Sequence, residues 1–538
     1  MKFLLISDIK LPYYAEAEEA LGIAAKRLKK VGISAFESDL TVYKRSLDAR
    51  DRASICFVYT VMARANCKKL PEKAQSLKIS EIADPYAELE YACGKEALGG
   101  RILVVGMGPC GLFAAYLLAK HGYRPIVIDR GGSVLERVKA VSAFYSEGKL
   151  DTETNVQFGA GGAGTFSDGK LVTRIKDAAC SYVLKTFVKH GADPDILRNA
   201  KPHIGTDVLR SVVENMLSEI ERLGGEVIYN CRLDSLAETS DGCIARTSKG
   251  DIKCGAVVLA VGHSARDTYE HLLSTGFAVK PKSFSVGVRI EHLQSDVDSS
   301  LYGALAGDQR LPQGEYALSD TKGERGVYTF CMCPGGYVMA ATSEEESVVV
   351  NGMSEKARDG RNANSAMLVS VSPEDFSFDV RKAMAFQRRL EKDAYRLGGS
   401  NYSAPVITVG DFKKKICRTD PARVIPTYMD GKYKVADIYS AMPNFLYDGI
   451  CRGLDSFSRK MECFSADDAV LSAFETRTSS PLRIERTEEM IAVGRNFIYP
   501  CGEGAGYAGG ITSAACDGIH AAQKIINRFA PKSEDKEI

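Results

Sequence analysis

Three glycines spaced as GxGxxG are the feature that most constrains how this chain can fold. They are Gly106, Gly108 and Gly111, and they lie between the apolar run 102–105 and a helical apolar pattern over 112–119. The first glycine permits a tight turn, the second lets a phosphate approach the backbone, and the third lets the helix pack closely on the strand. This arrangement predicts a strand, a phosphate-binding turn and a helix.

An acidic residue completes the pattern. Asp129 follows the second apolar run, 125–128, about 20 residues after the glycines, and a carboxylate there accepts hydrogen bonds from ribose hydroxyls. It would also repel a 2′-phosphate, which argues against NADP at this site. We therefore expect a Rossmann-type βαβ unit that binds a dinucleotide, with Pro109 and Arg130 beside the ligand.

Length and charge limit the other possibilities. A chain of 538 residues exceeds one hydrophobic core and predicts two or three domains. Its 70 Lys plus Arg balance 69 Asp plus Glu, so we expect no nucleic-acid partner and no membrane partner. The 15 cysteines are scattered, which favours reduced thiols in a cytoplasmic protein and no metal site. Cys331 and Cys333 lack the spacing of a zinc knuckle, and inert thiols are the simplest interpretation.

The periodicity predicts an α/β protein in three parts. Residues 1–95 read as a small N-terminal α/β domain, with strands near 2–6 and 55–61. Residues 96–283 and 489–538 read as one Rossmann-type domain in two segments, and 284–488 as an inserted mixed, β-rich substrate domain.

Two glycine-rich segments add further ligand contacts. The first contains Gly161, Gly162, Ala163 and Gly164, whose backbone N–H groups can surround a pyrophosphate or a flavin without side-chain obstruction. The second spans 502–510 and precedes the closing helix. A flexible surface loop is the alternative interpretation of the first segment.

Both segments belong to long motifs, at 155–171 and 499–510, that resemble those of a bacterial and plastid family of FAD-dependent dehydrogenases. That family lies within the glutathione-reductase-like flavoproteins, and the resemblance covers about residues 101–530. It is supported by motifs at 351–354, 362–366 and 475–481.

The resemblance implies FAD as the cofactor and assigns further contacts. Glu503 would bind ribitol hydroxyls, Arg137 would pair with a phosphate, and the closing helix would direct its positive end at the flavin. The alternatives are a solvated loop acid and an exposed helix arginine. The remaining contacts that it implies are the residues Gly262, Gly502, Gly504, Gly510 and Ile511.

Candidates for catalysis are Lys170, His263 and Arg477. Lys170 follows the first glycine-rich segment, and His263 is a possible proton donor. Arg477, like Arg289 and Arg483, can hold a carboxylate or phosphate through two parallel hydrogen bonds. A packing histidine and structural salt bridges are the alternative interpretations.

These features predict a flavin-dependent oxidoreductase that transfers a hydride between flavin and a small organic molecule. The chain carries one dinucleotide fingerprint, so we expect electrons from the substrate, or from a transient NAD(P)H or protein donor. Two alternatives remain: flavin-dependent modification of transfer RNA, and a flavin-binding redox regulator or adaptor.

Overall fold

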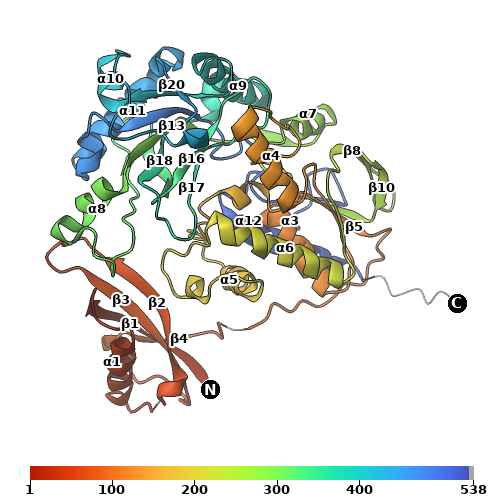
Figure 1. Ribbon diagram of the computed structural model, residues 1–538. Coiled ribbons are helices and arrows are strands. Elements are labelled where there is room, and N and C mark those ends of the chain that lie inside the picture. The colour runs from red at the N-terminus through yellow and green to blue at the C-terminus, as the bar shows by residue number, and fades with distance from the viewer. Residues whose placement is uncertain (35, 86, 532–538) are drawn as a thin grey trace.

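The computed structural model describes residues 1–34, 36–85 and 87–531. It is an α/β structure that combines a parallel sheet with antiparallel and mixed sheets. In Figure 1 the N-terminal sheet lies at the lower left, the parallel sheet at the right and the β-rich part at the upper left. Within the described residues, no helix has the length and apolar character needed to cross a bilayer.

The parallel sheet has the strand order β23-β11-β5-β6-β7. Its strands are β5 (Ile102–Val105), β6 (Ile126–Ile128), β7 (Glu226–Ile228), β11 (Ala256–Leu259) and β23 (Ile498–Pro500). Every residue of β5, β6, β11 and β23 is buried, as expected for strands that are covered on both faces. The sequence segments on either side of 284–488 therefore contribute to one sheet.

Helices and a small sheet cover the two faces. Ile102 and Val104 pack with α3 and α12 in one apolar cluster, whereas Leu103 and Val105 pack with the antiparallel sheet β10-β9-β8 in another. The helices are α3 (Pro109–Lys120), α4 (Val134–Glu147), α5 (Ala179–Lys189), α6 (Thr206–Arg222), α7 (Arg266–Ser274) and α12 (Ile511–Arg528). The small sheet is β8 (Leu233–Glu238), β9 (Cys243–Thr247) and β10 (Gly250–Cys254).

The β-rich part is built on a seven-stranded sheet of order β14-β15-β18-β13-β21-β19-β20. Its strands are β13 (Phe284–Leu293), β14 (Ser319–Asp320), β15 (Val327–Cys333), β18 (Asn362–Val371), β19 (Ala404–Thr408), β20 (Tyr433–Val435) and β21 (Val470–Glu475). Its helices are α8 (Gln294–Tyr302), α9 (Val380–Leu397), α10 (Val409–Lys414) and α11 (Asn444–Ser458). Two short ribbons accompany it, β12 (Val279–Pro281) with β22 (Leu482–Ile484), and β16 (Tyr337–Ala340) with β17 (Val350–Met353).

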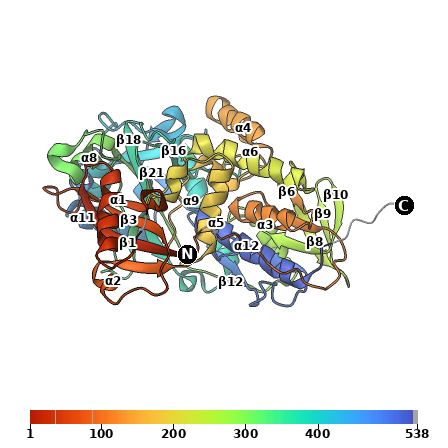
Figure 2. The same ribbon diagram turned by 90° about the horizontal axis from the view of Figure 1, so that it is seen from below.

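The N-terminal part is a four-stranded antiparallel sheet of order β2-β3-β1-β4 with α1 packed on it. Its elements are β1 (Lys2–Pro12), α1 (Glu18–Lys29), β2 (Leu40–Asp48), β3 (Cys56–Ala65), α2 (Lys73–Ser76) and β4 (Ile79–Ile82). The predicted strand 2–6 lies within β1, and the predicted strand 55–61 overlaps β3. Both observed strands are longer than expected. Figure 2 shows this sheet beside, rather than stacked on, the parallel-sheet part.

The segment that follows β4 packs against the parallel-sheet part. Gly94 N donates to the Ile526 carbonyl at 2.8 Å, and Glu96 pairs with Arg528 at 2.8 Å. The N-terminal sheet itself contacts both neighbours, because Arg45 donates to Asn199 and Arg52 donates to the Ser300 carbonyl. The predicted domain limits at 95, 283 and 488 stay predictions.

Candidate functional site

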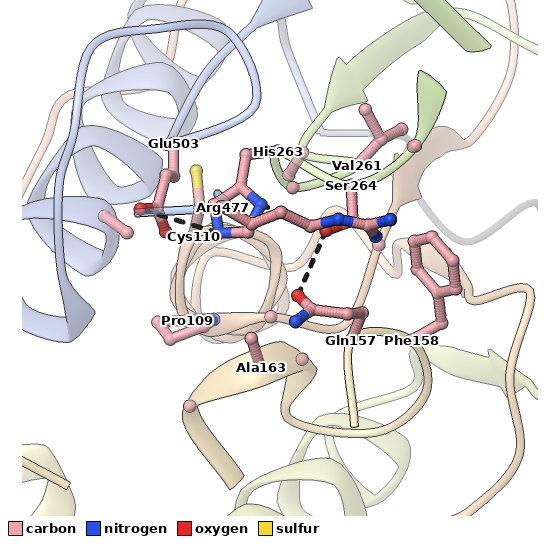
Figure 3. Close-up of a pocket in the computed structure, with 18 of the residues that line it drawn as sticks. Pro109, Cys110, Gln157, Phe158, Ala163, Val261, His263, Ser264, Arg477 and Glu503 are labelled. Carbon is pink, nitrogen blue, oxygen red and sulfur yellow. Dashed lines mark hydrogen bonds and ion pairs between the residues drawn. The ribbon is translucent and has the colours of Figure 1, made fainter. Parts of the chain in front are cut away.

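One cavity lies where the carboxyl ends of β5, β6 and β11 meet the β-rich sheet (Figure 3). Ligands of open α/β sheets bind at this edge. Most of the residues that the sequence nominated line the cavity. They are Gly106, Gly108, Pro109, Asp129, Arg130, Gly162, Ala163, Gly164, Lys170, Gly262, His263, Arg477, Glu503, Gly510 and Ile511.

The three glycines of the turn after β5 have separate tasks. Gly106 has a φ of +103°, and a Cβ on Gly111 would lie 1.9 Å from the Gly106 carbonyl oxygen, so both are required by the turn and by helix packing. Gly108 precedes α3 and borders open space: a Cβ there would meet only the Gly162 Cα at 3.9 Å. Gly108 therefore leaves a cradle between two glycine segments at the N-terminus of a helix.

Asp129 joins three loops at the edge of the cavity. Its carboxylate accepts hydrogen bonds from the backbone N–H groups of Met107 at 2.8 Å, Gly131 at 3.0 Å and Gly159 at 2.8 Å. An ionised carboxylate has about four acceptor sites, so about one remains for a hydroxyl. Asp129 is thus both a structural clamp and a candidate ribose contact.

Arg137 does not reach the cavity. Its guanidinium is fully buried and donates to the carbonyls of Asn155 at 3.0 Å, Val156 at 2.8 Å and Gly162 at 3.0 Å, and also to the Ala160 carbonyl. Burial lowers the pKa of Arg137 to about 9. The structure therefore does not bring this side chain to a phosphate, and its donors instead hold the first glycine-rich segment in place.

Four predicted glycines also lie behind the cavity surface. These residues are Gly111, Gly161, Gly502 and Gly504, and none lines the cavity. Gly504 shows their task, because a Cβ there would lie 2.5 Å from the Gly262 carbonyl oxygen. Because Gly504 has no Cβ, the C-terminal segment can approach the turn after β11. This approach places Glu503 over the cavity.

Glu503 and His263 point toward each other across the cavity, as Figure 3 shows. The Glu503 Oε1 lies 4.0 Å from the His263 Nε2. Burial raises the pKa of Glu503 to about 7, and Lys282 counteracts part of this effect. Burial, followed by the positive charges of Arg477 and Arg266, lowers the pKa of His263 to about 3. At neutral pH the imidazole is therefore uncharged, whereas the Glu503 carboxyl lies near its pKa.

The tautomer of His263 follows from its neighbours. Gln157 Nε2 donates to the Ala341 carbonyl at 3.1 Å, which fixes its Oε1 as the acceptor for the Ser264 hydroxyl at 3.1 Å. Because that hydroxyl proton is engaged, the His263 Nδ1, 3.1 Å from Ser264 Oγ, must carry the hydrogen. Nε2 is then an acceptor that faces Glu503, and with a pKa of about 3 the imidazole carries no second proton near neutral pH.

The arginine candidates separate in space. Arg477 lines the cavity, but it is also bound to the buried Glu391, with Nη2 at 2.8 Å from Oε2, and Arg266 binds the same carboxylate at 2.7 Å. Arg289 is fully buried behind the cavity wall in an ion pair with Glu475 at 2.8 Å. Arg483 lies outside the cavity lining, with its guanidinium over the ring of Tyr507. Of these three arginines, Arg477 alone lines the cavity.

Lys170 lies at the end of the cavity formed by the β-rich sheet. Its ammonium donates to the Met332 carbonyl and lies 3.9 Å from Asp168 and 3.8 Å from Glu315. Cys331, Asn351 and Glu475 line the same end, and the sequence nominated none of them as site residues. They come from three strands that are distant in the sequence. Asn351 and Glu475 open the motifs at 351–354 and 475–481, whereas Cys331 lies in neither.

Among the described residues, no group of three or more His, Cys, Asp or Glu side chains is arranged to hold a metal ion. The polar groups of the cavity are instead backbone N–H groups, carboxylates, a histidine, a lysine and three arginines. Such a set suits an organic ligand with phosphates and hydroxyls.

Comparisons with known proteins give matches over most of the chain. A family described as "FAD-dependent protein, C-terminal domain-like" matches residues 283–478, and a domain of unknown function matches residues 4–64. An uncharacterized protein of Clostridium beijerinckii is 44% identical over 520 residues, which are 95% of this chain and 97% of that protein.

Two solved structures resemble this chain at much lower sequence identity. CtdE in complex with FAD has 10% identity and a TM-score of 0.33, over 80% of this chain and 88% of that chain. A flavoprotein/dehydrogenase from Cytophaga hutchinsonii has 11% identity and a TM-score of 0.36, over 80% of both chains. At these TM-scores the likeness carries no functional inference.

Proposed function

We propose that the cavity binds one FAD and that the protein is an oxidoreductase acting on a small organic molecule, in keeping with the match of residues 283–478 to a family of FAD-dependent proteins. The observation that carries this proposal is the extent of the cavity. A single space reaches from Asp129 past the cradle at Gly108 to Glu503, and ends at the β-rich sheet beside Cys331. It therefore offers a nucleotide end and a substrate end in one site.

The nucleotide end has the groups that an ADP moiety requires. The cradle at Gly108 and the N-terminus of α3 present backbone N–H groups for a pyrophosphate, and Asp129 retains an acceptor for a ribose hydroxyl. Arg130 lies over the ring of Phe158 at 4.5 Å and is held by Glu153 and Asp267. The Arg130 guanidinium and the Phe158 ring form a flat, rigid surface at the same end, which suits an adenine ring.

The opposite end suits an isoalloxazine ring. Gly510 and Ile511 line the cavity at the N-terminus of α12, an 18-residue helix whose dipole favours negative charge at that point. Glu503 lies beside this helix end, with a pKa of about 7 that lets it accept a ribitol hydroxyl hydrogen bond or hold a proton. FAD, when bound, supplies hydride acceptance and donation at its ring.

Residues of the chain then position the substrate. Lys170 and Phe330 line the substrate end, where the ammonium attracts an anionic group and the ring adds an apolar contact. Arg477 lines the cavity beside His263 (Figure 3). Electrons come from the substrate or from a transient NAD(P)H or protein donor, since the sequence carries one dinucleotide fingerprint.

Substitution of Gly108 tests the cofactor site directly. In G108A the new Cβ fits the backbone, because its nearest neighbour lies 3.9 Å away, but it fills the cradle. We expect the purified variant to fold normally and to bind FAD more weakly by on the order of 100-fold, about 2.7 kcal/mol. Visible absorption of the purified protein and titration with FAD measure this effect.

The matched control is G22A, on the outer helix α1, where a Cβ also meets nothing within 4 Å. It should leave FAD binding unchanged. If the unmodified protein shows no flavin absorption after incubation with excess FAD, the proposal is wrong. Equal affinity in G108A and G22A would place the cofactor elsewhere.

A further inference from the structure

Two side chains at the substrate end of the cavity each leave one polar atom without a partner. They are Asn351 in β17 and Glu475 at the end of β21, and both line the cavity. The sequence motifs at 351–354 and 475–481 begin with these two residues, and the proposed FAD site uses neither of them. Strands β17 and β21 pack against each other, so two residues that are distant in the sequence meet on one wall.

One carboxylate oxygen of Glu475 is bound and the other is not. Arg289 Nη1 donates to Oε2 at 2.8 Å, whereas Oε1 accepts a hydrogen bond from none of the residues that the structure describes. The side chain is 2% exposed and lines the cavity, so its accessible part faces that space. Since each carboxylate oxygen has about two acceptor sites, Oε1 is an acceptor that a ligand in the cavity can use.

The amide of Asn351 has a fixed orientation. Its Oδ1 accepts from Gly352 N at 2.8 Å and from Arg289 Nη1 at 3.3 Å. Both partners are donors, so the oxygen and not the nitrogen must occupy this position. The Nδ2 group is then the other end of the amide, and it donates to no residue in the described part of the chain. Asn351 therefore offers a hydrogen-bond donor to the cavity.

Arg289 holds both side chains in place. It is fully buried, and its Nη1 contacts both Glu475 and Asn351, so the two lie side by side on the wall. Its Nε donates to Asn364 Oδ1 at 2.6 Å. Gly352 permits this approach, because a Cβ there would lie 2.1 Å from the arginine Nη2. The acceptor on Glu475 and the donor on Asn351 are therefore adjacent and preorganised.

This pattern of one acceptor beside one donor distinguishes between ligand groups. A carboxylate has no hydrogen for Glu475 Oε1, and an ammonium group has no acceptor for Asn351 Nδ2. An amide has both, an N–H donor next to a carbonyl acceptor. Lys170 at the same end is bound to the Met332 carbonyl and lies near two carboxylates, so its charge is largely compensated and does not reverse this preference.

We propose that Glu475 and Asn351 bind a carboxamide group on the ligand that occupies the substrate end of the cavity. The amide N–H donates to Glu475 Oε1, and the amide carbonyl accepts from Asn351 Nδ2. Phe330 lines the same end and offers an apolar contact to the ring or chain that carries the amide. The inference rests on the proposed function and deepens it. Two sources supply such a group: the nicotinamide of a transient hydride donor, and an amide-bearing substrate.

Ligand-observed NMR of the full-length protein, reconstituted with FAD at pH 8, tests this proposal. Burial raises the pKa of Glu475 to about 7, so the carboxylate is mainly ionised at pH 8. The probes are benzamide, benzoate, benzylamine and benzyl alcohol, which share one ring and differ in the polar group. We expect benzamide to bind about tenfold more tightly than each of the others. Equal or tighter binding of any other probe overturns the proposal.

Two substitutions change the pattern on the wall. In E475Q the amide oxygen must face Arg289, which turns the Nε2 donor toward the cavity beside that of Asn351. We expect this variant to bind benzoate about tenfold more tightly than benzamide, because two donors match two acceptors. In N351D the wall presents two acceptors, and benzamidine should bind more tightly than benzamide by a similar factor. The matched control is E462Q at an exposed glutamate, which should retain the preference for benzamide.

The outcomes are distinct. If E475Q does not fold, N351D decides alone, and a folded variant that still prefers benzamide overturns the proposal. Displacement of benzamide by NADH or NADPH, but not by ADP-ribose, assigns the amide to a visiting nicotinamide; retention of benzamide assigns it to an amide-bearing substrate. The visible spectrum of the same sample reports flavin separately. Flavin absorption without a preference for benzamide overturns the amide site alone, whereas that preference in a protein that cannot bind FAD overturns the proposed function.

Discussion

On one wall of the cavity, glycines and backbone groups face the open space; on the opposite wall, a lysine, an arginine, a glutamate and a thiol do. The first wall comes from short contiguous segments at the ends of β5, β6 and β11. The second is assembled from Lys170, which follows the first glycine-rich segment, and from β15, β17, β21 and the residues that follow β21. A backbone wall can accept one generic ligand group, such as a pyrophosphate, in many proteins. A side-chain wall selects a substrate and depends on buried partners that hold each charge.

The ion pairs behind the side-chain wall give the largest expected effect. In E391Q the buried arginines Arg266 and Arg477 lose their shared carboxylate, to which each has a contact of 2.7 or 2.8 Å. We expect the free energy of unfolding to fall by about 3–5 kcal/mol, because an uncompensated buried charge remains. Urea unfolding followed by circular dichroism measures this change.

The control is E345Q, at an exposed glutamate next to the Glu344 of the same cluster. It should change the free energy of unfolding by less than about 0.5 kcal/mol. Equal effects of the two substitutions would show that the wall does not depend on its buried partners.

Arg137 tests how far the backbone wall depends on one buried side chain. In R137M, four backbone carbonyls lose a charged donor, and we expect a loss of about 2–4 kcal/mol in unfolding free energy, with weaker FAD binding as a consequence. Urea unfolding and FAD titration are both needed. R210M is the matched control, because Arg210 contacts the same Phe166 ring at 4.8 Å. Weaker FAD binding with unchanged stability would mean that Arg137 contacts the cofactor itself.

Glu503 gives the smallest expected effect and carries a pH dependence. Its pKa is raised from 4.5 to about 7 in the folded protein, so between these values the folded state binds more protons than the unfolded chain. The contribution of Glu503 to stability therefore falls as the pH rises through this window. We expect the unfolding free energy of E503Q to rise by about 2 kcal/mol, relative to that of the unmodified protein, from pH 5 to pH 8. Urea unfolding at both pH values measures this change. If the two proteins differ in unfolding free energy by the same amount at pH 5 and at pH 8, this assignment is wrong.

How much of the site was predictable differs between the walls. Gly106, Gly108 and Asp129 were found from spacing alone, because a phosphate turn requires particular residues a few positions apart. Arg137 was interpreted as a phosphate contact, yet the structure buries it against carbonyls. Spacing along a helix does not show which face of that helix is covered.

The other wall was predictable only in part. Lys170 and Arg477 were nominated, but Glu475, Asn351 and the orientation of Cys331 were not. Their significance depends on Arg289, which lies 42 residues before Cys331 and 186 before Glu475 in the chain. No local pattern records such a pairing.

The sequence by itself determined the class of the fold, the glycine turn after β5 and the identity of the small residues around it. Those features follow from backbone geometry over a few residues, which local sequence controls. The tertiary structure decided which charges are paired, that His263 is uncharged at neutral pH, and that Cys331 lines the cavity. Ionisation and reactivity depend on burial and on partners brought together by folding, because the energy of a charge is set by everything that surrounds it in space.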